Sequence, residues 1–133
     1  MNLGTMLAPD SIAVIGASAD PKRMSGMIIS QIRDFGFKGS VFPINPKYEE
    51  LAGFPCHGYI RDLKHTPPDV AVVFVNADAA LEAAKDCAEI GVGSLIVLTA
   101  GFAETGEEGT AKQLRLADIC REARMPACGP NTA

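Results

Sequence analysis

Hydrophobic residues recur along the chain in two alternating patterns, short apolar runs and longer amphipathic stretches. The runs are rich in Val, Ile and Ala, which is typical of strands that a parallel sheet buries on both faces. They occupy 11–16, 40–45, 69–75, 94–98 and 126–128. Apolar residues at three- and four-residue spacing predict helices over 26–35, 78–90 and 107–124.

Strands that alternate with helices form parallel β-α-β units with right-handed crossovers. We therefore expect a single α/β domain over 1–133, with a Rossmann-type, doubly wound parallel sheet of five strands in a three-layer arrangement. The simplest strand order is 3-2-1-4-5, which puts the switch point between strands one and four. Ligands bind beyond the carboxyl ends of the strands at such a point, so loops 16–25 and 99–106 are expected to form the site.

Two parts of the chain fit this alternation less well. Residues 1–10 are expected to be a lead that packs against the sheet edge at most. Residues 46–68 carry several Gly and Pro residues and leave room for one helical turn near 48–51. Pro43 lies inside the second strand, which suggests that strand pairing is interrupted there.

The first strand ends at Gly16, where the backbone must turn tightly and can let a ligand come close. The helix that follows would present free amide groups and its positive dipole end to the same spot, which makes an anion site. Ser25 is the expected N-cap of that helix. An ordinary strand–turn–helix without a ligand is the alternative.

Composition excludes several classes of protein. The net charge is −4, and the 12 basic residues form no stripe, which argues against nucleic acid binding. No apolar run has the length of a membrane helix, and the first residues lack a signal-peptide pattern. Cys56, Cys87, Cys120 and Cys128 show no C-x-x-C spacing, so free thiols in a reducing cytoplasm are expected rather than disulfides or zinc ligands.

The nucleotide preference depends on two short segments. A dinucleotide fold usually shows G-x-G-x-x-G and an acidic residue after strand two, whereas this chain has Gly16-Ala17-Ser18 and Asn45-Pro46-Lys47. A lysine at that position suits an added phosphate, as in NADP or the 3′-phosphate of coenzyme A. A solvated surface lysine is the alternative.

These segments, taken with others, carry a family resemblance. The chain resembles the CoA-binding domain of the NDP-forming acyl-CoA synthetases, relatives of the succinyl-CoA ligase α subunit. The matching segments cover nearly the whole chain in order: AVIGAS at 13–18, DPK at 20–22, GFKG at 36–39, INPK at 44–47, LAG at 51–53, TAGFAETG at 99–106 and GPN at 129–131.

The resemblance implies coenzyme A as the cofactor and assigns a role to each segment. Phosphate would be cradled by Gly16, Ala17 and Ser18, with Ser25 and Gly26 completing the nest at the helix start. Lys47, with Pro46 beside it, would meet the nucleotide end of CoA, and Val75, Asn76, Thr99, Ala100 and Gly101 would flank the pantetheine arm.

The chain departs from the family pattern in two ways, one of which concerns the branch of the family and the other the length of the chain. Ala100 stands where the succinyl-CoA ligase branch has a glutamate, which favours the acyl-CoA synthetase branch. The family's phosphorylated histidine lies in a following domain, so 1–133 is expected to be an N-terminal part of a longer ligase. Ligase and nucleotide-binding domains, in the same chain or in a partner subunit, are the expected partners besides CoA.

No catalytic or metal-binding residue is predicted within the chain. His57 and His65 lie in the irregular connector without an acidic or cysteine partner at usable spacing. The expected function is therefore CoA binding within an NDP-forming acyl-CoA synthetase, with the chain alone inactive. A stand-alone CoA-responsive binding protein and, less well supported, an NADP-dependent oxidoreductase domain remain as alternatives.

Overall fold

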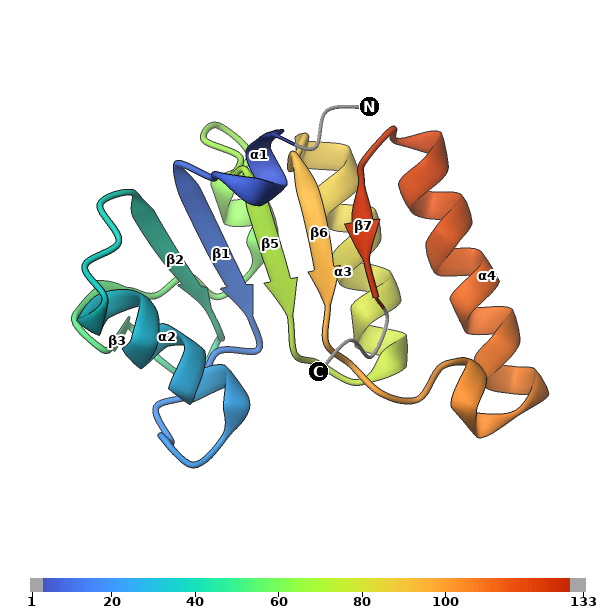
Figure 1. Ribbon diagram of the computed structural model, residues 1–133, viewed down its shortest axis with the longest axis horizontal. Coiled ribbons are helices and arrows are strands. Elements are labelled where there is room, and N and C mark those ends of the chain that lie inside the picture. Colours follow the sequence, from blue (N-terminus) through green and yellow to red (C-terminus); the bar gives the residue numbers. More distant parts are fainter. Residues whose placement is uncertain (1–3, 130–133) are drawn as a thin grey trace.

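A five-stranded parallel sheet forms the centre of the computed structural model, which describes residues 4–129 (Figure 1). Its strands are β1 (Ser11–Ile15), β2 (Ser40–Ile44), β5 (Val70–Val73), β6 (Ser94–Val97) and β7 (Ala127–Cys128). The helices are α1 (Gly4–Leu7), α2 (Met24–Asp34), α3 (Ala77–Ile90) and α4 (Glu107–Glu122). The three long helices and five strands confirm the predicted fold class. The GPN segment at 129–131 lies outside the described residues except for its glycine.

The strand order in the sheet is β2-β1-β5-β6-β7. Counting only the five strands of this sheet in chain order, this is 2-1-3-4-5, so the expected order 3-2-1-4-5 is wrong. β5 pairs with β1 through Ala13↔Ala71 and Val14↔Val72. All four β5 residues are buried, which suits a central strand, whereas β2 carries a proline and an exposed Ser40, which suits an edge. The switch point therefore lies between β1 and β5, and the loops after these two strands meet there.

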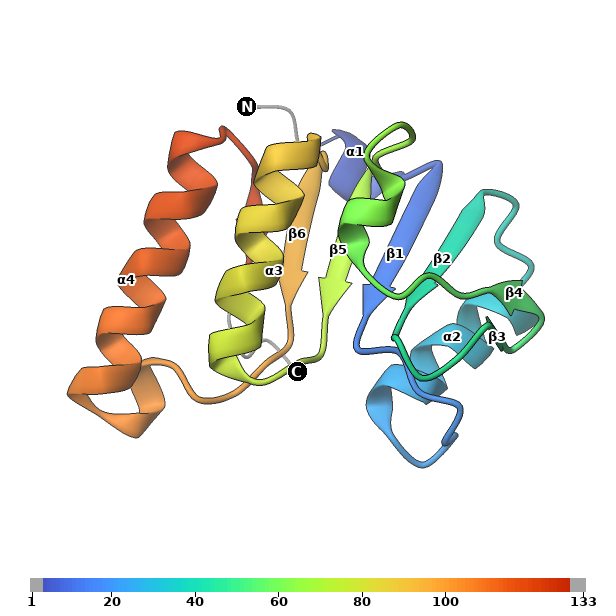
Figure 2. The ribbon, with the colours of Figure 1, turned by 180° about the vertical axis from the view of Figure 1, so that it is seen from behind.

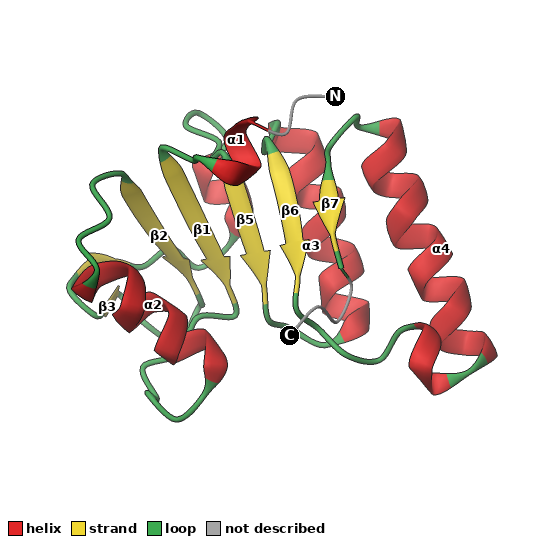
Figure 3. Ribbon diagram, in the orientation of Figure 1, coloured by secondary structure: helices red, strands yellow, loops and turns green. Residues whose placement is uncertain are grey.

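Each face of the sheet has its own hydrophobic cluster. α3 and α4 pack with alternate residues of the strands, among them Ala71, Val73 and Leu95, on one face (Figure 2). On the other face α2 covers only β1 and β2, where Ile29 packs with Val14 (Figures 1 and 3). Doubly wound sheets carry helices on both faces, and here the second layer is the smaller one.

The start and end of α2 differ from the prediction. Arg23, in an extended conformation without a side-chain cap, precedes the helix, and Ser25 lies inside the first turn, so Ser25 is not the N-cap. Phe35, the last residue of the predicted helix 26–35, lies beyond the end of α2 and is 87% exposed. The α3 boundaries fit better: the Asn76 side chain accepts from the Ala79 amide at 2.9 Å, and Gly91 ends the helix with φ +89°.

The connector after β2 also differs from expectation. A small antiparallel pair, β3 (Glu50–Leu51) with β4 (Phe54–Pro55), replaces the predicted helical turn, and a 3-10 turn follows at Ile60–Leu63. Pairing with β1 continues past Pro43, because this proline turns its missing N–H outward. On that outer side its carbonyl accepts from the His57 amide at 3.0 Å, which covers the sheet edge.

Candidate functional site

Gly16 lets the two switch-point loops approach each other. Its φ is +85°, and a Cβ added there would lie 2.9 Å from Val75 Cγ1 and 3.2 Å from the Phe74 carbonyl oxygen. The Gly16 and Ala17 amides both donate to the Ile44 carbonyl, at 3.0 and 3.3 Å. These two amides therefore hold the turn against β2, and an anion would have to meet amides further along the loop.

Such amides occur at Ser18 and Ala19, which have no acceptor within the described part of the chain, and at the first turn of α2. The loop between them is closed by its own bonds. Ser18 Oγ accepts from the Asp20 amide at 3.0 Å, and Asp20 Oδ1 accepts from the Lys22 amide at 2.9 Å. A fixed loop with free amides at a helix start is suited to bind a phosphate.

Gly26 supports that loop sterically. A Cβ at this position would lie 2.2 Å from the Asp20 carbonyl oxygen and 2.9 Å from that of Ser18. The missing side chain therefore lets the Ser18–Asp20 segment cross the first turn of α2, beside the buried Ser25.

A groove of about 530 Å³ opens next to Gly16, between the turn after β2 and the face of α3. Its walls are mainly apolar, with Ile44 and Val75 near Gly16. The exposed Lys47 lies at the rim beside Pro46, and carboxylates of α3 line the far wall. An apolar groove with a cation at one end suits a ligand that has a ring system and a phosphate.

Asn45, which sequence reasoning did not single out, links the groove to the first loop. Its Nδ2 donates to the Ala17 carbonyl at 2.8 Å, and its Oδ1 accepts from the Lys47 amide at 2.9 Å. The INPK segment contains the signal, because an asparagine directly after a strand can bond neighbouring backbone groups.

The loop after β6 lies one strand further along the sheet. Ala100 and Gly101 line a second hollow of about 400 Å³, together with Asn76 at the start of α3. Thr99 is buried, and its hydroxyl donates to the Val73 carbonyl at 3.4 Å. The predicted meeting of loops 16–25 and 99–106 is therefore corrected: Gly16 meets Val75, and Val75-Asn76 connects the two hollows.

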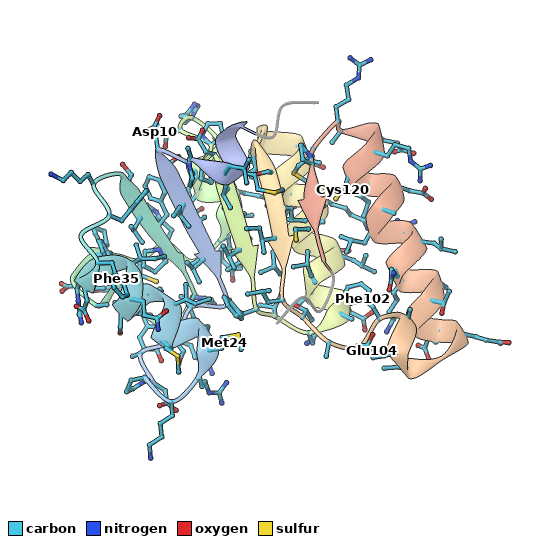
Figure 4. The ribbon with its side chains drawn as sticks, in the orientation of Figure 1. Asp10, Met24, Phe35, Phe102, Glu104 and Cys120 are labelled. Carbon is cyan, nitrogen blue, oxygen red and sulfur yellow. The ribbon has the colours of Figure 1, made fainter. Side chains whose placement is uncertain are left out.

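This second hollow is acidic rather than basic. Its Lys112 ammonium pairs with Asp78 at 3.1 Å and lies 3.8 Å from Glu108. Glu104 accepts from the amides of Gly101 and Phe102, at the carboxyl end of the sheet (Figure 4). Hydrogen bonds from its own amide and from these two lower the pKa of the Glu104 carboxyl. Negative charge here disfavours phosphate, so the hollow suits an uncharged part of a ligand.

Neither hollow is lined by a histidine or cysteine of the described residues. The His57 ring meets the Phe42 ring edge-on at 6.0 Å. Burial raises the pKa of the Cys87 thiol to about 12, and burial also raises the pKa of the Cys56 and Cys120 thiols. In residues 4–129 no three His, Cys, Asp or Glu side chains come together as metal ligands, and no helix is long and apolar enough to cross a membrane.

The fold and the groove thus define a doubly wound α/β domain. The loop at its switch point has free amides that are suited to bind a phosphate. The chain belongs to the CoA binding domain family, whose family model matches residues 10–133. It is a CoA-binding domain homologous to that of the NDP-forming acyl-CoA synthetases, with coenzyme A as its ligand.

The chain spans only about a fifth to a quarter of the length of the two curated enzymes described next. It is 34% identical over 126 residues to trans-feruloyl-CoA synthase FCS1 of an unknown prokaryotic organism, covering 95% of this chain and 18% of that protein. It is 33% identical over 123 residues to subunit alpha of the ADP-forming acetate–CoA ligase II of Pyrococcus furiosus, covering 92% and 26%. The apo structure of the dinucleotide forming acetyl-coenzyme A synthetase 1 of Ca. Korarchaeum cryptofilum superposes with a TM-score of 0.90 at 36% identity, over 98% of this chain and 28% of that one.

Proposed function

We propose that this chain holds CoA for an NDP-forming acyl-CoA synthetase, which converts an acid, CoA and a nucleoside triphosphate reversibly into acyl-CoA, nucleoside diphosphate and phosphate. The observation that carries the proposal is the groove at the β1–β5 switch point, with free loop amides on one side and Lys47 on the other. The unpaired cysteines fit a reducing cytoplasm.

The ligand path follows from the charges around the two hollows. The pyrophosphate would lie at the loop amides and the start of α2, the 3′-phosphate at Lys47, and the adenosine against the apolar groove. The uncharged pantetheine arm would pass Val75-Asn76 toward the second hollow. The residues proposed to form the site are Gly16, Ala17, Ser18, Ser25, Gly26, Pro46, Lys47, Val75, Asn76, Thr99, Ala100 and Gly101. Gly16 and Ala17 shape the turn and do not donate to the ligand, because their amides are bonded to Ile44.

A thermal-shift titration tests CoA binding directly. CoA at about a hundred times its dissociation constant stabilises the folded chain by about 2.7 kcal/mol, since it binds the folded state only. NADP is the matched control, because it also carries a ribose phosphate but lacks the pantetheine arm. Folded protein that shows no shift with millimolar CoA, or that responds equally to NADP, would contradict the proposal.

The chain alone is expected to make no acyl-CoA. Ligation needs a nucleotide site and a phosphate carrier, and we propose that both lie in the domains that the longer relatives possess. Purified chain is incubated with ATP, Mg²⁺, CoA and a panel of short acids, and acyl-CoA is followed by mass spectrometry. Turnover that survives repurification and is lost in His57→Ala or His65→Ala would show that the chain is itself an enzyme.

A further inference from the structure

One side of the sheet lacks a helical cover over its second half. α3 and α4 both lie on one face, and on the opposite face α2 covers only β1 and β2 (Figures 1 and 2). The short α1 contacts β6 near its amino end. Among the described residues no helix covers the carboxyl halves of β5, β6 and β7 on the α2 side.

The exposed fraction of the side chains rises along one row of paired residues that runs across the strands on this face. Val14, Val72, Ile96 and Cys128 are neighbours across four strands. Val14 lies under α2 and is 0% exposed, and Val72 is 8% exposed. Ile96 is partly exposed and Cys128 is exposed. On this face of the sheet, the strands beyond those that α2 covers are therefore increasingly exposed.

The uncovered residues are apolar. Ile96 and Leu98 are only partly buried and belong to neither hydrophobic cluster. Met24 and Met27 of α2 are also apolar and exposed, at 47% and 45%, and Met24 is the first residue of that helix (Figure 4). We call Val72, Ile96, Leu98 and Cys128 the open sheet face. Parallel sheets are almost always covered on both faces, so this one requires an occupant.

The handedness of the crossovers shows on which face a further helix would lie. Right-handed connections that move from β5 to β6 to β7 put α3 and α4 on one face, whereas the connection from β1 back to β2 puts α2 on the other. A helix that follows β7 and returns toward β1 would lie on the open sheet face. The longer relatives have the chain length for it, since the matched region is only 18% and 26% of the two compared above.

We propose that a helix of the polypeptide following residue 133 packs on the open sheet face and joins this domain to the rest of a ligase. The inference rests on the proposed function in one respect, because it treats the chain as part of a longer protein. It does not depend on CoA, whose groove is lined by other residues.

The rate at which thiols react tests the proposal when it is compared between two forms of the protein. The short form is residues 1–133, and the long form is the whole product of the reading frame. Cys128 reacts readily with a maleimide in the short form and about tenfold or more slowly in the long one, because burial denies the reagent access. Peptide mass spectrometry separates it from Cys87, whose burial keeps it unreactive in both forms and so reports that each is folded.

Two reporter cysteines make the test specific. In the Ile96→Cys variant, the new cysteine lies in the middle of the open sheet face. It should react with maleimide more slowly in the long form, as Cys128 does. Leu114→Cys, at the groove between α3 and α4 on the opposite face of the sheet and 63% exposed in the parent chain, reacts equally in both. Equal rates at position 96 and at Cys128 in the two forms, or a reading frame that ends at Ala133, would overturn the proposal. A CoA titration of both forms separates this result from the CoA proposal, because a protected face without a CoA response contradicts only the latter.

Discussion

Replacing Phe102 by alanine is expected to lower the free energy of unfolding by about 3–5 kcal/mol, the usual loss for a fully buried phenylalanine. Phe102 is 0% exposed and packs into the cluster between the sheet and helices α3 and α4. Its carbonyl also accepts from the Thr105 amide and hydroxyl, at 3.0 and 2.9 Å. Denaturant unfolding followed by circular dichroism measures the loss.

Leu114→Ala is the matched control, because Leu114 is 63% exposed on α4 and should change stability by no more than about 0.5 kcal/mol. Phe102→Leu should recover most of the loss, since it refills much of the cavity. A Phe102→Ala variant as stable as Leu114→Ala would mean that the loop after β6 is not anchored in the core. The loop would then need another support at the second hollow.

Most elements of the fold could be predicted because their signals are local. Apolar runs marked β1, β5 and β6, and the three- and four-residue spacing marked α3 to within one residue at its start. Gly16 was identified by its place after a strand, and its φ of +85° and contact with Val75 explain the glycine. The apolar runs, the helical spacing and the place of Gly16 after a strand depend on residues close together in the sequence, whereas the approach of Val75 to Gly16 does not.

Strand order could not be predicted from the same signals. Both 3-2-1-4-5 and 2-1-3-4-5 satisfy right-handed crossovers, so the choice depends on which strand tolerates an edge. Pro43 and the polar start of β2 carry that information, but a proline inside a strand is equally compatible with a break in pairing. The wrong order paired the first loop with the loop after β6 instead of the one after β5.

The sequence predicts which residues form the candidate site but not the hydrogen bonds among them. The charge of Lys47 and the glycine of the first turn were recognisable in the sequence. The engagement of the Gly16 and Ala17 amides by Ile44 depends on a neighbouring strand, as does the bond from Asn45 to Ala17. Residue type alone predicts Ser25 as an N-cap, whereas α2 begins one residue earlier, at Met24.

Lys47→Ala is expected to weaken CoA binding about 10- to 100-fold. A charge-assisted hydrogen bond contributes about 1.5–3 kcal/mol, and each 1.4 kcal/mol corresponds to about a factor of ten in the dissociation constant. Lys47 is exposed at the groove rim, and Asn45 Oδ1 fixes its backbone through a 2.9 Å bond. Isothermal titration calorimetry of parent and variant gives the two dissociation constants.

Dephospho-CoA, which lacks the 3′-phosphate, separates the possible roles of this lysine. If Lys47 binds that phosphate, dephospho-CoA binds the parent about as weakly as CoA binds the variant, and the substitution changes its affinity little. Lys38→Ala removes an exposed lysine that does not line the groove and controls for net charge, so it should leave both affinities unchanged at a given ionic strength. Equal losses for CoA and dephospho-CoA would instead assign Lys47 to the pyrophosphate, and no loss for either would remove it from the site.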